Sequence, residues 1–341
     1  MMVAARRARK DPATETLLRG INDDLLPAER RLEAAYDAPR FPVIFVLGTP
    51  RSGSTLVSLC LAHTGTVGYI SNFVARFWKA PVFGARMEQA LNIRREGSGG
   101  FDSEYGIAEG LASPHEFGYF WSRWFKFGQD THQVSAEDLA RVDVGAMRRS
   151  VAALEGFYEQ PMSFKNNTWI NFQTAFLAKV FPNAVFLVCR REPIYVAQSI
   201  LVARRKLLGS EAHWWSVRPS TYQSLLRLPW WEQIAGQTVD IEREIDEGLK
   251  RVPARQVIDI PYRAFCERPA GLIESLRDRL SGLGFELAAG RPLPPAFAHT
   301  DERRIAEADW KLLEAALSRR AHSGPDRRGY STKGDTWNSP T

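Results

Sequence analysis

Short apolar segments alternate along the chain with longer segments whose apolar positions have helical spacing. The short segments are rich in β-branched and aromatic residues, and they lie at 43–47, 66–70, 162–165, 184–190 and 256–260. Short runs that are apolar on both faces are typical of buried parallel strands. Strands separated by helices indicate a parallel sheet that is covered on both faces. The pattern therefore predicts an α/β fold, a three-layer sandwich with a central parallel sheet.

The segments between the strands predict the remaining organisation. Helical spacing predicts helices at 14–36, 54–63, 71–90, 115–127, 135–158, 168–180, 193–207, 221–249, 269–282 and 302–321. Residues 94–114 are instead rich in glycine and serine, which predicts a long loop or lid. We expect an N-terminal helical extension at 1–40 and one α/β domain at 41–322, with a helical and loop insertion at about 71–160. A flexible polar tail is expected at 323–341.

The composition limits the class of ligand. The 341 residues include 45 Lys and Arg against 39 Asp and Glu, a formal net charge of +6. This excess fits a polyanionic ligand or an acidic acceptor. Acidic residues are interleaved with the basic ones almost throughout, so no basic stripe predicts nucleic-acid binding. At 44% hydrophobic residues, the chain can form a large core.

Cysteine usage and hydropathy predict the cellular compartment of the protein. The three cysteines, Cys60, Cys189 and Cys266, lie far apart and predict neither a disulfide framework nor a zinc site. His63 and His132 have no metal-ligand partners at useful spacing, and we expect no metal. The apolar runs are shorter than the roughly 20 residues of a membrane helix. We expect a cytoplasmic protein, with peripheral membrane contact left open and the oligomeric state not predicted.

The first expected strand runs into the sequence LGTPRSGSTL, which places Gly48 and Gly53 at the glycine positions of a phosphate-binding P-loop. The N–H groups of residues 52–55 are expected to converge at a helix N-terminus, where anions bind. Arg51 adds a planar guanidinium suited to oxyanions, and hydroxyls follow the second glycine. The alternative is a plain tight turn with a serine N-cap.

The P-loop lysine is missing from this sequence, since Ser54 occupies its position. A nucleoside triphosphatase needs that lysine, together with magnesium and a strand-borne aspartate. The strand at 184–190 is followed by Arg191 instead, and Asp259 lies inside its own strand. The loop is therefore poorly equipped for a triphosphate.

A second strand, turn and helix occurs in VFLVCRREPIYVAQSI. Arg191 comes at the end of the strand, and Ser199 follows eight residues later. Both side chains can face the crevice at the carboxyl edge of the sheet, where ligands bind in open α/β folds. The alternative is a surface salt bridge and an ordinary helix serine. Two anion sites at one sheet edge indicate a ligand with two separated phosphate-type groups.

These motifs resemble those of the sulfotransferases that use 3′-phosphoadenosine 5′-phosphosulfate (PAPS). GTPRSGSTL is similar to their 5′-phosphosulfate loop in its arginine form, and RREPIYVAQS is similar to their 3′-phosphate segment. FKNNTWINFQTAFLAKVFPNAVFLVCRREP and IPYRAFCERPAGLIESLRDRLSGLG resemble the stretches that surround these motifs. The resemblance covers 41–70 and 161–283.

The resemblance implies a P-loop-like fold and a PAPS-dependent sulfotransferase. It implies that the 5′-phosphosulfate is held by Arg51, Ser52, Gly53, Ser54 and Thr55, and that Arg191 and Ser199 hold the 3′-phosphate. The acceptor is a hydroxyl or an amine, with a carbohydrate or a glycan-bearing molecule as our expectation. In the tail, Arg327, Arg328 and Gly329 resemble a segment that completes the 3′-phosphate site, though at a different spacing.

The general base is not given by the resemblance. Related enzymes often carry a glutamate just after the second strand, where this chain has Ser71 and Asn72. The nearest candidates are His115 and Glu116, for which the alternative is a helix-capping role. Lys165 is a candidate for stabilising the developing charge, and its alternative is a structural strand-end cation.

Two other function classes remain open at this stage. One is a P-loop kinase or nucleotide hydrolase. The other is a polyanion-binding protein without catalysis, since the glutamate after the second strand is missing.

Overall fold

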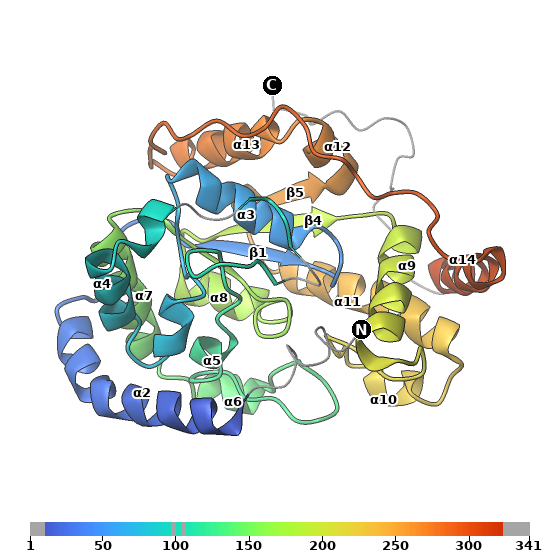
Figure 1. Ribbon diagram of the computed structural model, residues 1–341, viewed down its shortest axis with the longest axis horizontal. Coiled ribbons are helices and arrows are strands. Elements are labelled where there is room, and N and C mark those ends of the chain that lie inside the picture. The colour runs from blue at the N-terminus through green and yellow to red at the C-terminus, as the bar shows by residue number, and fades with distance from the viewer. Residues whose placement is uncertain (1–10, 97–99, 104–106, 323–341) are drawn as a thin grey trace.

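The structure is a computed structural model that describes residues 11–96, 100–103 and 107–322. Five strands form one parallel sheet (Figure 1). They are β1 (Ile44–Gly48), β2 (Gly68–Tyr69), β3 (Met162–Lys165), β4 (Val185–Arg190) and β5 (Val257–Pro261), in the order β2-β3-β1-β4-β5. The predicted α/β class and its central parallel sheet are confirmed.

Alternation along β1 explains the three layers. Phe45 and Leu47 belong to an apolar cluster with helices α5, α7 and α8, whereas Ile44 and Val46 belong to a second cluster with α3, α12 and α13. Because successive side chains of a strand point to opposite faces, this one strand anchors the cores on both sides. A third cluster joins α9, α11 and α14 beside the sheet.

Apart from α3, the helices before β4 are α2 (Pro12–Glu33), η1 (Val74–Phe77), α4 (Pro81–Ala90), η2 (Ile93–Glu96), α5 (Gly118–Trp121), α6 (Ala136–Ala140), α7 (Val144–Tyr158) and α8 (Thr174–Val180). The predicted helix at 71–90 is interrupted, because Pro81 starts a new helix. The predicted helix at 115–127 is wrong. Only the four residues of α5 are α-helical there, because Phe117 adopts a left-handed φ of 54° ahead of it.

The remaining helices are α3 (Ser54–Thr64), α9 (Pro193–Ala203), the π-helical turn η3 (Arg204–Leu208), α10 (Tyr222–Leu225), α11 (Trp230–Leu249), η4 (Ala254–Gln256), α12 (Tyr262–Glu267), α13 (Ala270–Ser281) and α14 (Glu307–His322). Between α13 and α14 the chain has no helix or strand. This connection is hydrogen-bonded to the end of α3, to α12 and to Arg191 after β4, and its residues matter for the candidate site.

Two segments predicted from the sequence lie partly or wholly outside the described residues. The predicted lid at 94–114 includes segments outside them, as does the whole predicted tail at 323–341. Within the described residues, no helix is both long and apolar enough to span a membrane. The cysteines Cys60, Cys189 and Cys266 are buried and form no disulfide.

Candidate functional site

The first predicted motif forms the turn between β1 and α3 at the carboxyl edge of the sheet (Figure 1). Gly53 is the N-cap of α3 with a φ of 98°, and Arg51 has a φ of 73°. The first backbone bond into the helix runs from Val57 N to Gly53 O over 3.2 Å, so the N–H groups ahead of it have no intrahelical acceptor. The turn therefore presents donors at the positive end of a helix, as an anion site requires.

The hydroxyls of the turn are placed at different depths. Ser52 and Ser54 are buried, whereas Thr55 is half-buried. Among the described residues, Ser52 Oγ finds no hydrogen-bond partner although it is buried. Buried hydroxyls normally have a partner, so this donor is available to a bound group.

Asn171 holds the start of the turn. Its Nδ2 donates to Gly48 O over 2.9 Å, and Gly48 N donates to its Oδ1 over 3.2 Å. Both backbone groups at the end of β1 are thereby satisfied by one amide. Sequence reasoning missed Asn171, because an asparagine downstream of another strand carries no local signal of this pairing.

The second predicted motif joins the first. Arg51 Nε donates to Ser199 Oγ over 2.8 Å, and Arg191 Nη1 donates to Arg51 O over 2.8 Å. Arg191 follows β4 and Ser199 lies in α9, so two segments about 140 residues from Arg51 meet its turn. The structure thus brings Arg51, Arg191 and Ser199 together, as the two motifs predict.

Arg191 is more enclosed than the sequence indicates. Its Nε donates to Asp301 over 2.8 Å, and its Nη2 donates to Thr300 O over 3.1 Å and to Thr300 Oγ1 over 2.9 Å. The side chains of Arg191 and Asp301 are only 5% and 4% exposed, and the guanidinium lies 4.5 Å from the Tyr262 ring centre. With Arg51 O, this guanidinium serves four acceptors. Sequence reasoning missed Thr300 and Asp301, which lie between α13 and α14.

The candidate catalytic side chains of Glu116 and of β3 also meet. Lys165, at the end of β3, forms an ion pair with Glu116. Asn166 Nδ2 donates to Glu116 O over 3.0 Å. The side chain of Lys165 is 8% exposed and that of Glu116 is 41% exposed, so the carboxylate lies at the open end of the pair. The contact places Glu116 at the carboxyl edge of the sheet.

The path of the chain explains how Glu116 gets there. Pro114 bridges to Ser71 in antiparallel fashion, and His115 N donates to Ile70 O over 2.8 Å. Residues 114–116 therefore lie alongside the residues that follow β2. The expected glutamate after the second strand is absent from the sequence, and a carboxylate from a distant segment lies nearby instead.

The capping alternative for Glu116 is wrong. Ser113 Oγ donates to Glu109 O rather than accepting from a helix N–H, and the N-cap of α5 is Phe117. Glu116 therefore precedes the helix, and its carboxylate is held by Lys165 rather than by a helix N-terminus.

His115 is held in one tautomer. Its Nδ1 accepts from Phe117 N over 2.8 Å. In the neutral ring the proton then sits on Nε2, which leaves no ring nitrogen able to take another proton while this bond holds. This geometry favours Glu116 over His115 as the proton acceptor.

Asn167 connects the two parts of the candidate site. Its Nδ2 donates to Ser54 Oγ over 3.4 Å, at the start of α3. Its Oδ1 is buried and has no partner among the described residues. The segment that follows β3 is therefore hydrogen-bonded to the first turn of α3 by a side chain that can still accept a hydrogen bond.

Some predicted features lie elsewhere. Arg327, Arg328 and Gly329 fall outside the described residues. Trp121 is completely buried in the core beneath the sheet, as the packing interpretation of the tryptophans expects. Across residues 11–96, 100–103 and 107–322, no group of three metal-ligating side chains converges.

Comparisons with known proteins find similarity to sulfotransferases over most of the chain. A model of the sulfotransferase family matches residues 42–286, which include all five strands and both motifs. A crystal structure of a sulfotransferase from Mycobacterium tuberculosis is similar, at 14% identity and a TM-score of 0.51, over 90% of this chain and 82% of its own. A sulfotransferase from Mycobacterium avium has 14% identity and a TM-score of 0.48, over 93% and 79%. A search of curated proteins finds no match.

Proposed function

Because the chain belongs to the sulfotransferase family, we propose that it transfers a sulfuryl group from PAPS to a hydroxyl or amine acceptor. A carbohydrate or a glycan-bearing molecule is the acceptor class that we propose. The family match supports sulfuryl transfer in general, and the PAPS donor and the acceptor class are the finer parts of the proposal.

One observation supports PAPS as the donor. The hydrogen bonds from Arg51 to Ser199 and from Arg191 to Arg51 make one unit of the two anion motifs. A donor with a 5′-phosphosulfate and a 3′-phosphate presents two anionic groups to such a unit. The buried hydroxyl of Ser52 and the N–H groups at the start of α3 supply further donors. Asp301 already neutralises Arg191, so the 3′-phosphate adds to an existing ion pair there.

The residues divide the chemistry between them. The sulfur–oxygen bond to the departing bisphosphate breaks while a new bond forms from sulfur to the acceptor, to oxygen for a hydroxyl and to nitrogen for an amine. Arg51 and the turn N–H groups stabilise the negative charge on the leaving oxygen, in the manner of an oxyanion hole. Glu116 takes the proton of the acceptor, and Lys165 holds that carboxylate in place and adds positive charge near the transferred group.

Calorimetry with 3′-phosphoadenosine 5′-phosphate and with Mg²⁺–ATP tests the donor. We expect tight binding of the bisphosphate without magnesium, and a large loss of that binding in Arg51→Ala. Arg141→Ala is the matched control, since its ion pairs within the described residues are with the exposed carboxylates of α6. Preference for Mg²⁺–ATP overturns the proposal in favour of a kinase or hydrolase.

Transfer of ³⁵S from labelled PAPS to a panel of sugars, phenols and amines tests the reaction. We expect Glu116→Gln to lower kcat by about 10²–10⁴-fold while bisphosphate binding is kept, as for loss of a general base. His115→Ala is expected to keep most of the turnover. Full activity in Glu116→Gln rules out the assigned base, and bisphosphate binding without any transfer leaves a binding protein.

A further inference from the structure

One side-chain amide joins the segment of the candidate base to a tryptophan. Asn166, which is 3% exposed, donates from Nδ2 to Glu116 O over 3.0 Å. Its Oδ1 accepts from Thr168 N and from Trp169 N, each over 2.9 Å. Because the two ends of one amide hold both segments, the backbone of Trp169 is fixed beside that of Glu116.

The indole of Trp169 reaches toward the start of α5. A Cβ atom built on Gly118 lies 3.3 Å from Trp169 Nε1 and 3.5 Å from Asn166 Nδ2, so a side chain at 118 would crowd this edge of the indole. Among the described residues, Trp169 Nε1 has no hydrogen-bond acceptor, although buried tryptophan N–H groups usually find one. Trp169 is half-buried, and the side chain of Glu116 is 41% exposed. The indole therefore offers a donor beside the candidate base.

Two further rings continue from Trp169 and form an aromatic row with it. The ring centre of Phe127 lies 4.1 Å from that of Trp169, with the ring planes 33° apart. The ring centre of His132 lies 4.5 Å from that of Phe127, and His132 N donates to Arg218 O over 2.9 Å. Burial lowers the pKa of His132 to about 3, with Arg218 acting in the same direction. The ring is therefore neutral at physiological pH, and the aromatic row carries no charge.

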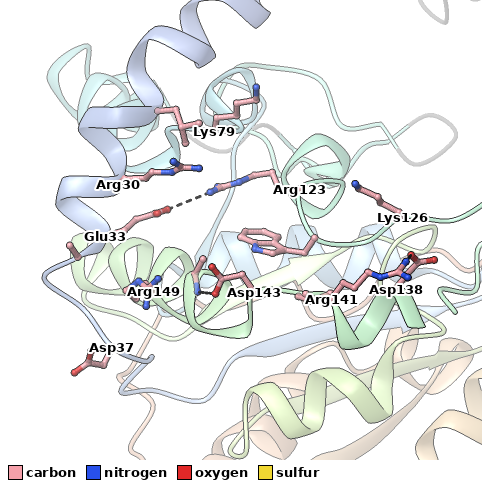
Figure 2. A pocket seen from close by; sticks show the side chains of 15 residues that line it. Arg30, Glu33, Asp37, Lys79, Arg123, Lys126, Asp138, Arg141, Asp143 and Arg149 are labelled. Atoms are coloured by element: carbon pink, nitrogen blue, oxygen red, sulfur yellow. Dashed lines mark hydrogen bonds and ion pairs between the residues drawn. The ribbon is translucent and has the colours of Figure 1, made fainter. Parts of the chain in front are cut away.

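The segment that carries Phe127 also contributes to a charged hollow. Arg123 and Lys126 line this hollow of about 1010 Å³, which lies between α2, α6 and α7 (Figure 2). Arg123 pairs there with Glu33 at 3.8 Å. Phe127 does not line the hollow and packs against Trp169 instead. The aromatic row is therefore distinct from the charged hollow, and its Trp169 end lies beside Glu116.

We propose that Trp169 determines acceptor specificity by holding a sugar ring beside Glu116, an inference that rests on the proposed function. The apolar C–H face of a sugar packs against an aromatic side chain, and its further hydroxyls accept hydrogen bonds. The indole supplies both contacts, through its ring and through Nε1. Phenol has a single oxygen, which is the reacting atom, so it leaves the indole N–H unpaired. The site therefore favours a sugar over a phenol.

Saturation-transfer NMR on the full-length protein tests this contact, with and without 3′-phosphoadenosine 5′-phosphate. The probes are the methyl glycosides of glucose, galactose and N-acetylglucosamine, with phenol for comparison. Trp169→Ala should weaken glycoside binding by about tenfold or more, because it removes the ring and the donor. Trp169→Phe keeps a ring and loses only the N–H, so it should weaken glycosides by about 2–10-fold and leave phenol unchanged. Gly118→Ala should also weaken glycosides, since its Cβ crowds the indole N–H.

Two controls make the test specific. Trp310 in α14 is also half-buried and packs against Tyr195, and Trp310→Phe should bind the glycosides as the unmodified protein does. Calorimetry should show that the Trp169 variants keep their bisphosphate affinity, which also shows that they fold.

Three results overturn the inference. They are no glycoside binding to the unmodified protein, equal glycoside binding by Trp169→Ala, and a loss of phenol affinity in Trp169→Phe as large as that of the glycosides. Failure of the unmodified protein to bind the bisphosphate overturns the proposed donor instead. The glycoside comparison is then decided by the spectra recorded without bisphosphate.

Discussion

At the scale of single residues, the shape of the turn at 48–54 depends on side chains far from it in the sequence. Asn171 bonds both backbone groups of Gly48, and the ring of Tyr262 lies directly against Gly53. A Cβ atom built on Gly53 comes within 2.6 Å of Tyr262 Cδ2. Glycine at this position is therefore required by its neighbour as well as by its φ of 98°.

Gly53→Ala is expected to lower the free energy of unfolding by about 1–3 kcal/mol, through the strained φ and the contact with Tyr262. Bisphosphate affinity should fall as well, since the turn must shift. Urea unfolding and calorimetry measure the two effects. Gly20→Ala in α2 is the control, because a Cβ there meets nothing within 4 Å and alanine favours the helix. Unchanged stability in Gly53→Ala contradicts the argument.

At the scale of elements, the sequence predicts what local pattern determines. The strands and α3 follow from apolar runs and from glycine positions, and the structure has them within a few residues. The helix at 115–127 fails, because the apolar residues there are core aromatics of an irregular segment, with Phe120 and Trp121 completely buried. The pairing of Lys165 with Glu116 and of Arg191 with Asp301 depends on tertiary contacts over 49 and 110 residues, which no local pattern encodes.

Asp301→Asn tests the connection between α13 and α14. It leaves the buried Arg191 charge without its carboxylate, which we expect to cost about 3–5 kcal/mol of stability. Asp309→Asn, which removes a more exposed pair with Arg205, should cost at most about 1 kcal/mol. Added bisphosphate should raise the melting temperature of Asp301→Asn more than that of the unmodified protein, because it supplies a replacement anion. Equal shifts contradict a phosphate contact by Arg191.

The docking of α2 on α4 predicts a pH dependence. Glu29 in α2 accepts from Val82 N and Phe83 N, and burial raises its pKa to about 7 from 4.5. The folded state then holds a proton that the unfolded state releases, so this contribution is full below pH 4.5 and is lost as the pH rises through 7. Chemical unfolding should show about 2–3 kcal/mol less stability at pH 8 than at pH 5 from this group.

Glu29→Gln should remove that part of the slope. Glu314→Gln, at an exposed position of α14, should leave the slope as it is. A Glu29→Gln profile that parallels the unmodified protein shows that Glu29 does not take up the proton.

At the scale of the whole molecule, the candidate site lies where separate cores meet. The sheet clusters support the turn at 48–54, whereas α9 with Ser199 belongs to the third cluster with α11 and α14. Hydrogen bonds from Arg51 and Arg191 join these parts. Packing far from the site should therefore affect ligand affinity through the position of α9.

Leu313→Ala tests this connection. Leu313 is completely buried in the third cluster, so the change should cost about 2–5 kcal/mol and weaken bisphosphate binding by displacing α9. Leu312→Ala is the control, since the side chain of Leu312 is 37% exposed. Calorimetry and thermal unfolding of the two variants provide the comparison. Loss of stability without any loss of affinity shows that α9 keeps its place when its packing against Leu313 is lost.

The alkylation rate of the three buried thiols can report how often the structure around the turn at 48–54 opens. Cys60, Cys189 and Cys266 lie in α3, β4 and α12, the elements that surround the turn at 48–54. Burial raises the pKa of all three, so alkylation at neutral pH must wait for these elements to open. A ligand that binds only the closed arrangement should slow alkylation in proportion to its occupancy. The rate of thiol loss then reports on the turn without any label or knowledge of the acceptor.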